Sequence, residues 1–203
     1  MQNSSRKQKS DVVKLSLTLF VIAGVMALLV AFVNNLTAPI IEKRSEEKIT
    51  VALKEVMPNA ESFEQHTLQT SSVKSTDGKD VSIDGAWFAK SNGDIIGVCV
   101  KVSPQGYGGV IETIVGIDMN CSVKQAKIVS MSETSGIGTK IQSDSFLTQF
   151  NGKLAGIVGV SGQPENNQIQ VISGATKSSK AYLRGINAAL EIANQMLGGE
   201  DNE

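Results

Sequence analysis

Histidine and cysteine are scarce in this sequence, which excludes several classes of functional site. The 203 residues include two cysteines, no CxxC pair and one histidine, His66. Two cysteines are too few for a disulfide framework or for a zinc site made of cysteines alone. One histidine without a partner motif supports no Ser/His/Asp arrangement. We therefore expect His66 to lie on the surface, and we predict neither a metal site nor a catalytic site of the hydrolytic kind.

Aromatic residues and excess positive charge are scarce as well. Phe, Trp and Tyr make up 4% of the chain, and 19 Lys and Arg stand against 20 Asp and Glu, for a formal net charge of −1. Domains that bind nucleic acid typically present a basic face or aromatic platforms for the bases. We therefore expect no nucleic acid among the partners.

The sequence does contain one long uncharged segment near its N-terminus. All nineteen residues from Leu15 to Val33 are uncharged, and nearly all are apolar. As a helix they would span about 28 Å, close to the thickness of the hydrocarbon core of a bilayer. A cleaved signal peptide has a shorter apolar region and a cleavage site of small residues, whereas Leu36 and Pro39 follow this run. We predict a retained transmembrane helix over residues 15–38.

The residues before this segment bear on its orientation. The tail over residues 1–14 carries four basic residues and one acid, Asp11. Lys and Arg counts set topology, and the counts at the two ends of the segment differ only slightly. The short basic tail nevertheless resembles a cytoplasmic tail ahead of a signal anchor. We expect a single-pass protein of the cell (inner) membrane, in contact with membrane lipid, with its globular domain on the extracytoplasmic side.

The segment over residues 39–57 is predicted to form a separate juxtamembrane helix. Pro39 suits a first helical position, an apolar stripe runs along one side, and Pro58 with Asn59 would end it. Two interpretations stay open. In the first, the helix is a plain stalk or a packing helix of the domain, and in the second it is a contact surface for membrane partners.

The following domain, residues 58–198, begins with segments typical of strands. Residues 61–85 are polar and predict loops with one short strand. A strand over 86–90 is followed by Asn92-Gly93-Asp94, a strong turn signal. Further β-branched runs predict strands over residues 95–102, 110–118 and 123–132. Their short connections favour an antiparallel meander.

The second half of the domain alternates loops with helices. We predict a short helix over 144–150, a strand over 168–172, and a long helix over 177–197 with one apolar face, ended by Gly198 and Gly199. Residues 199–203 form a tail that we expect to be disordered. The fold class is therefore α+β: a single N-terminal transmembrane helix followed by a mostly antiparallel sheet packed with helices.

The segment Ser173-Gly174-Ala175-Thr176 lies between the last predicted strand and the long helix. Ser173 can serve as the N-cap, and Gly174 allows the backbone to approach a ligand closely. The N-terminus of the helix presents free N–H groups and the positive end of a dipole, which favour a phosphate. The residues alone leave open whether this is a helix cap or a phosphate site.

Several motifs along the chain occur in the order of one known family. They are the N-terminal span, the TAP–IIE start of the next segment, GYGG over 106–109, VGID over 115–118, ETSGIG over 133–138, NGK over 151–153 and SGAT over 173–176. With them the chain resembles the G subunit of the Rnf-type ion-translocating ferredoxin:NAD oxidoreductase. More distantly, it is similar to the C subunit of the sodium-pumping NADH:quinone reductase.

The resemblance implies a cofactor and a site. In that family the last threonine of SGAT is esterified to the phosphate of FMN by a separate flavin transferase, so the covalent phosphoester would form on Thr176. The rest of the motif and the two glycine-rich loops would line the FMN. These implied contacts are Ser173, Gly174, Ala175, Gly106, Tyr107, Glu133, Thr134, Gly136 and Gly138.

The chain departs from the family's pattern at two positions. The family usually has an aspartate three residues before the SGAT serine, where this chain has Gln170. It also has a proline in the loop that here reads ETSGIG, where Ser135 stands. The first departure bears on how efficiently Thr176 is modified, and the second on how tightly the loop is held.

The implied function is that of an electron relay without catalytic residues of its own. The chain would carry electrons within a membrane complex that couples ferredoxin/NAD electron transfer to Na⁺ or H⁺ translocation, beside the other membrane and peripheral subunits. No GxGxxG motif follows a strand, so NAD would be bound elsewhere. Two alternatives are a membrane-anchored module that binds a phosphate ligand non-covalently and a pilin-like structural protein.

Overall fold

The computed structural model of the chain describes residues 2–68, 70–75 and 77–198, and side chains from residue 14 onward. The predicted tail over residues 199–203 lies outside the described residues. The chain divides into two compact units, Met1–Glu47 and Lys48–Glu203. The second unit contains the sheet and every predicted site residue.

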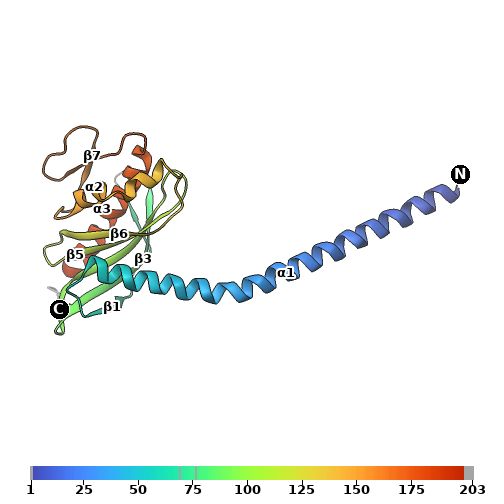
Figure 1. Cartoon of the computed structure of the whole chain (residues 1–203), viewed down its shortest axis with the longest axis horizontal. Helices are drawn as coiled ribbons and strands as arrows, with labels where there is room; N and C mark the ends of the chain where they lie inside the picture. The colour runs from blue at the N-terminus through green and yellow to red at the C-terminus, as the bar shows by residue number, and fades with distance from the viewer. Residues whose placement is uncertain (1, 69, 76, 199–203) are drawn as a thin grey trace. The chain divides into compact units, whose positions relative to one another are not determined.

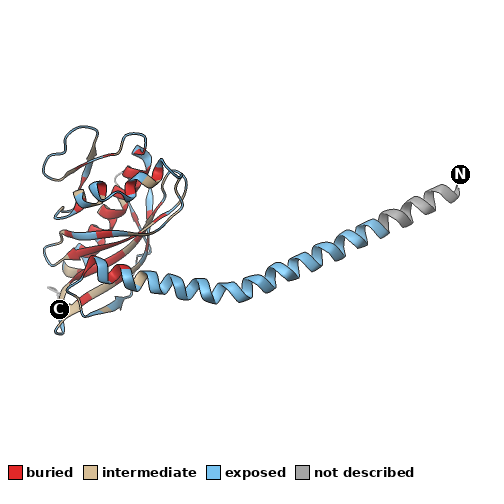
Figure 2. Ribbon diagram, in the orientation of Figure 1, coloured by how far each residue is buried: buried red, intermediate tan, exposed pale blue. Residues whose placement is uncertain are grey.

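The N-terminal helix α1 (Gln2–Val56) is one continuous helix. It runs through Pro39, so the predicted start of a separate helix at that position is wrong. Proline lacks one N–H donor and disturbs the preceding turn, and the helix nevertheless continues through this position. Residues 14–48 are exposed throughout, as the pale blue ribbon in Figure 2 shows. The helix is long and apolar enough to cross a membrane.

The core of the second unit is a six-stranded antiparallel sheet with the order β1-β3-β4-β5-β6, in which β2 also pairs with β3. Its last four strands form the predicted meander, and the predicted fold class is confirmed (Figure 1). The strands are β1 (Ser62–His66), β2 (Ser72–Lys74), β3 (Asp80–Ser91), β4 (Asp94–Pro104), β5 (Ile111–Asp118) and β6 (Val123–Met131).

The turn between β3 and β4 is the predicted two-residue turn. Asn92 and Gly93 have φ angles of 52° and 91°, as a type I′ hairpin turn requires. The start of β3 differs from the prediction, since β3 already begins at Asp80 and β1 and β2 precede it. Val81 and Ile83 are buried and alternate with exposed polar residues. The high content of Ser and Asp in this segment hides the alternation in the sequence.

The remaining elements follow the meander. The predicted short helix is divided into α2 (Asp144–Leu147) and the 3-10 helix η2 (Thr148–Phe150). The predicted last strand and long helix correspond to β8 (Gln168–Gln170) and α3 (Thr176–Gly198). Two elements were not predicted: the 3-10 helix η1 (Gly138–Gln142) and β7 (Val158–Val160), which pairs in parallel with β8.

The sheet buries residues on both faces. Successive strand residues point to opposite faces: Val98 and Val100 pack with α3, whereas Cys99 between them packs with the end of α1. At Gly116 an added Cβ would come within 2.7 Å of the carbonyl oxygen of Val56, so this glycine allows the helix end to approach the sheet. The packing interpretation of the juxtamembrane segment is therefore confirmed for its last residues, which are Ala52, Leu53, Val56 and Met57.

Candidate functional site

The SGAT segment forms a tight turn between β8 and α3. The N–H of Ala175 donates to the carbonyl oxygen of Ile172 at 3.0 Å, which closes a four-residue turn. Gly174 has a φ angle of 80°, and the third position of a type II turn requires such a positive φ. The glycine of the motif is therefore needed for the backbone direction of this turn.

Ser179, in the first turn of α3, fixes this turn through two hydrogen bonds. Its Oγ donates to the carbonyl oxygen of Ala175 at 2.9 Å and accepts the N–H of Ile172 at 3.2 Å. The Ser179 side chain is fully buried. One hydroxyl therefore ties the segment after β8 to the start of α3, and we infer that the SGAT backbone is rigid.

Thr176 is the first residue of α3 and is exposed. Ala175 therefore occupies the N-cap position, and the prediction that Ser173 caps the helix is wrong, because Ser173 lies two residues before the cap. The first N–H groups of a helix lack partners within it and carry the positive end of the dipole. With 23 residues, α3 is long enough for this end to attract an anion beside the Thr176 hydroxyl.

Glu133 joins three parts of the chain. Its Oε1 accepts the N–H of Tyr107 at 2.7 Å, and its Oε2 accepts the N–H of Gly108 at 3.2 Å. Oε2 also accepts the hydroxyl of Ser178 at 3.1 Å. The carboxylate thus connects both predicted glycine-rich loops to the first turn of α3.

Two of the predicted site glycines lie against this same carboxylate. A Cβ atom added at Gly106 would overlap Oε1 of Glu133, and one added at Gly138 would overlap Oε2. Gly138 is buried, and Gly106 is half-buried. Their lack of side chains makes room for Glu133.

Tyr107 places an exposed aromatic ring beside the start of α3. Its side chain is 63% exposed, and Nζ of Lys177 lies 4.8 Å from the centroid of the ring. A cation at this distance over an aromatic face is attracted by the ring quadrupole. Because Lys177 follows Thr176 directly, this contact brings the GYGG loop to the predicted attachment residue.

The remaining predicted residues lie in the loop before and within η1. The carbonyl oxygen of Thr134 accepts the N–H of Gly138 at 2.9 Å, and the N–H of Gly136 donates to Oγ1 of Thr139 at 2.9 Å. Gly136 has a φ angle of 76° and is exposed. These contacts fix the fold of the loop itself.

Models of two known families match the chain. The model described as FMN-binding domain matches residues 106–191, and the model described as RnfG N-terminal region matches residues 1–56. The first range contains all ten predicted site residues. The second ends where α1 ends.

The chain also has relatives with established names. It is 35% identical over 189 residues to the G subunit of the Na(+)-translocating ferredoxin:NAD(+) oxidoreductase complex of Acetobacterium woodii, covering 89% of this chain and 91% of the relative. This chain belongs to the family of G subunits of ion-translocating oxidoreductase complexes. Another relative, the G subunit of the proton-translocating ferredoxin:NAD(+) oxidoreductase complex of Clostridium ljungdahlii, is 27% identical over 196 residues, covering 96% of this chain and 98% of the relative.

Among solved structures, NqrC of Shewanella oneidensis is similar with a TM-score of 0.49 and 15% identity, over 71% of this chain and 72% of that chain. The assignment to the G-subunit family rests on the sequence relatives. It confirms the resemblance seen in the motifs and leaves the pilin-like alternative without support.

Gln170, which replaces the aspartate usual in the G-subunit family, ends β8. Its N–H donates to Oε1 of Gln149 at 2.7 Å, and its own side chain is exposed. The backbone here is held by a neighbouring side chain, so the local fold of β8 does not depend on a carboxylate at position 170.

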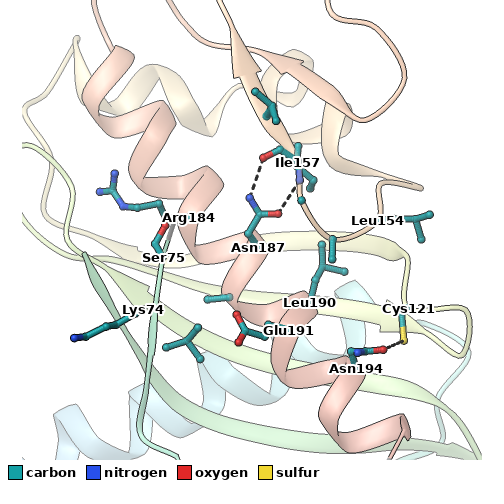
Figure 3. Close-up of a pocket in the computed structure, with 15 residues that line it drawn as sticks. Lys74, Ser75, Cys121, Leu154, Ile157, Arg184, Asn187, Leu190, Glu191 and Asn194 are labelled. Atoms are coloured by element: carbon teal, nitrogen blue, oxygen red, sulfur yellow. Dashed lines mark hydrogen bonds between the residues drawn. The ribbon is translucent and has the colours of Figure 1, made fainter. Parts of the chain in front are cut away.

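A cavity of about 560 Å³ lies along the middle of α3 (Figure 3). Its lining includes Cys121, Ile157, Asn187 and Asn194, and none of the ten predicted site residues. The amide of Asn187 pairs with both backbone groups of Ile157, each at 2.9 Å, as the dashed lines show. These hydrogen bonds hold the loop that contains Ile157 on α3. Because no predicted site residue lines the cavity, its size alone does not mark it as the cofactor site.

The residues around Thr176 fit FMN better. An exposed hydroxyl stands at a helix N-terminus, two lysines follow it at positions 177 and 180, and exposed Tyr107 lies alongside. Ile137 on the second loop is 49% exposed. This set offers an anion site for a phosphate and apolar surface for a ring system. Ser178 was not among the predicted contacts, although it follows SGAT after Lys177 and adds a hydroxyl at this turn.

Proposed function

We propose that this chain is an electron-transfer subunit with FMN attached covalently to Thr176, in a membrane complex that couples ferredoxin/NAD electron transfer to ion translocation. The observation that carries the proposal is the match of residues 106–191 to the FMN-binding domain in a chain of the G-subunit family. The geometry around Thr176 supports it. When bound, FMN supplies the redox chemistry, and the protein supplies position and electrostatics.

Thr176 is suited to be the attachment residue for three reasons. It is exposed, so a separate flavin transferase can reach its hydroxyl. It stands at the positive end of a long helix, where a phosphate is stabilised. The turn before it is fixed by Ser179, so little backbone entropy remains to be lost on modification.

The other residues would orient the cofactor. Lys177 and Lys180 add positive charge next to the phosphate position, and the Tyr107 ring gives an aromatic surface on the same side. The chain binds and positions one relay centre, while the chemistry of ferredoxin and NAD belongs to partner subunits. A covalent link would keep the cofactor in place on the extracytoplasmic side of the inner membrane, where a cytoplasmic pool could not replace it.

The coupling ion is a property of the complex. One relative is named for Na⁺ translocation and another for proton translocation, so both kinds of coupling occur among related complexes.

The test is the mass and fluorescence of the denatured chain after co-expression with a flavin transferase. We expect the wild-type chain to carry the added mass of one esterified FMN and to fluoresce after denaturation. Thr176→Ala should lose both signals. Ser173→Ala removes another exposed hydroxyl from the same turn. Because Ser173 is a predicted FMN contact and not the esterified residue, this variant should still carry the added mass.

The opposite results are equally informative. An unmodified wild-type chain, under conditions in which a related G subunit is modified, would disprove attachment at Thr176 and would point to Gln170 as the cause. Flavin that co-purifies with the native chain but is lost on denaturation would support the non-covalent alternative. Loss of the added mass in Ser173→Ala, with retention in Thr176→Ala, would move the attachment by three residues.

A further inference from the structure

Glu133 accepts three hydrogen bonds from two distant segments. The N–H groups of Tyr107 and Gly108 come from the loop between β4 and β5, and the hydroxyl of Ser178 comes from α3. A carboxylate has about four acceptor positions. Three donors from the protein therefore occupy most of its capacity.

The surroundings of the carboxylate leave little space for a ligand. Gly106 and Gly138 lie so close to its two oxygens that a methyl group at either position would overlap them. Ser178 is 2% exposed, so the hydrogen bond from its hydroxyl is shielded from water. The family resemblance implied that Glu133 contacts FMN, whereas these contacts direct it toward the protein.

The arrangement has a consequence for Tyr107. The backbone of this residue is held by Glu133, and its ring lies 4.8 Å from Nζ of Lys177. Ser178 and Lys177 belong to the same helical turn as Thr176. The position of the ring relative to the attachment residue therefore depends on one carboxylate.

We propose that Glu133 is a positioning residue that holds the 106–109 loop against the first turn of α3, and that it is not itself an FMN contact. The part that concerns the flavin rests on the proposed function. The part that concerns the loop does not, since its three hydrogen bonds lie within the protein. Hydrogen bonds to a charged acceptor are among the stronger ones, which suits a residue that must order a loop of three glycines.

The first experiment measures the loop in the absence of flavin. Thr176→Ala serves as the flavin-free parent, and backbone amide hydrogen exchange is followed by mass spectrometry in a peptide that covers residues 105–110 of the full chain in detergent. In this background Glu133→Ala should speed exchange of two amides by about ten-fold or more, since each loses a hydrogen bond to a charged group. Ser178→Ala should speed it by a smaller factor.

The matched control is Glu61→Ala. Oε2 of Glu61 accepts the N–H of Asn92 at 3.0 Å in the turn between β3 and β4, so it is also a carboxylate that holds a loop amide. Its loss should speed exchange near residue 92 and leave residues 105–110 unchanged. If Glu133→Ala does not fold, Ser178→Ala decides the question, because it removes one small hydroxyl. Unchanged exchange at 105–110 in the folded variants would overturn the proposal.

The second experiment uses the flavin-loaded chain. Ser178→Ala changes no charge, so any effect on the flavin reports position. We expect both Glu133→Ala and Ser178→Ala to change native flavin fluorescence relative to the wild type, because the neighbouring Tyr107 ring moves, and the difference should vanish after denaturation. An effect of Glu133→Ala alone, without faster loop exchange, would mean that Glu133 contacts the flavin and would overturn the proposal. A wild-type chain without flavin would refute the proposed function and leave the exchange experiment valid.

Discussion

The two long helices of this chain use similar residues in different ways. Both α1 and α3 contain several Ala, Leu and Ile residues. In α1, residues 14–48 are exposed throughout, including large side chains such as Phe20 and Leu28. In α3, 13 of 23 residues are buried, which makes it the central helix of the domain core (Figure 2).

The difference lies in how apolar residues are distributed around each helix. The buried residues of α3 recur with helical spacing, as at Leu183, Ile186, Leu190 and Ala193, and this stripe packs on the sheet. The apolar residues of α1 surround the helix. A helix that is apolar on all sides needs an apolar environment on all sides, which for exposed residues in a chain of this family means lipid. The anchor therefore differs from the core helix both in having no charged residue from Leu15 to Val33 and in having apolar residues on all sides.

The largest expected effect comes from one truncation made in each helix. Ile186 is fully buried, and Leu29 is 53% exposed. Ile186→Ala should lower the free energy of unfolding of the domain by about 2–5 kcal/mol through lost burial and the resulting cavity, whereas Leu29→Ala should leave it unchanged. Urea unfolding in detergent, followed by the fluorescence of Trp87, the only tryptophan, measures both. Equal destabilisation by the two variants would show that the exposed part of α1 also belongs to the domain core.

A charged residue substituted into α1 tests the same difference between the membrane anchor and the core helix. Leu29→Arg places a charge near the middle of the predicted transmembrane helix over residues 15–38, where insertion becomes less favourable by about 2.5–3.5 kcal/mol. Leu15→Arg, at the end of this segment, is the control, because a long basic side chain there can reach the membrane interface. The fraction of chain that resists alkaline extraction from membranes should fall for Leu29→Arg only. Similar retention of both variants would contradict a membrane-spanning role.

The fold was predictable where periodicity was strong. The meander from β3 to β6 and the helix α3 were found because β-branched runs and an apolar stripe mark them. The start of β3 was missed because Ser82 separates Val81 from Ile83 and Asp84 follows Ile83, so each apolar residue looks isolated. β7 has three residues and pairs in parallel with β8, and such a pairing depends on the tertiary fold.

The candidate site was predictable in its members and less so in their roles. The motifs identified the SGAT turn and both loops, and the structure brings these segments together at one end of α3. What the sequence could not show is that Glu133 faces three protein donors. Hydrogen bonds across 25 to 45 positions depend on how the sheet places its loops, and no local pattern encodes them.

The smallest of these effects concerns the first turn of α3, where a buried and an exposed hydroxyl lie three residues apart. Ser179→Ala removes the acceptor of the Ile172 N–H and should lower the free energy of unfolding by about 1–3 kcal/mol, because a partly buried donor loses its partner. Thr176→Ala, at an exposed position, should change this free energy by less than about 0.5 kcal/mol. The same urea titration of flavin-free chains compares them. If Thr176→Ala proved the more destabilising, Thr176 would be a structural residue of the turn, and its loss of flavin would no longer identify the attachment site.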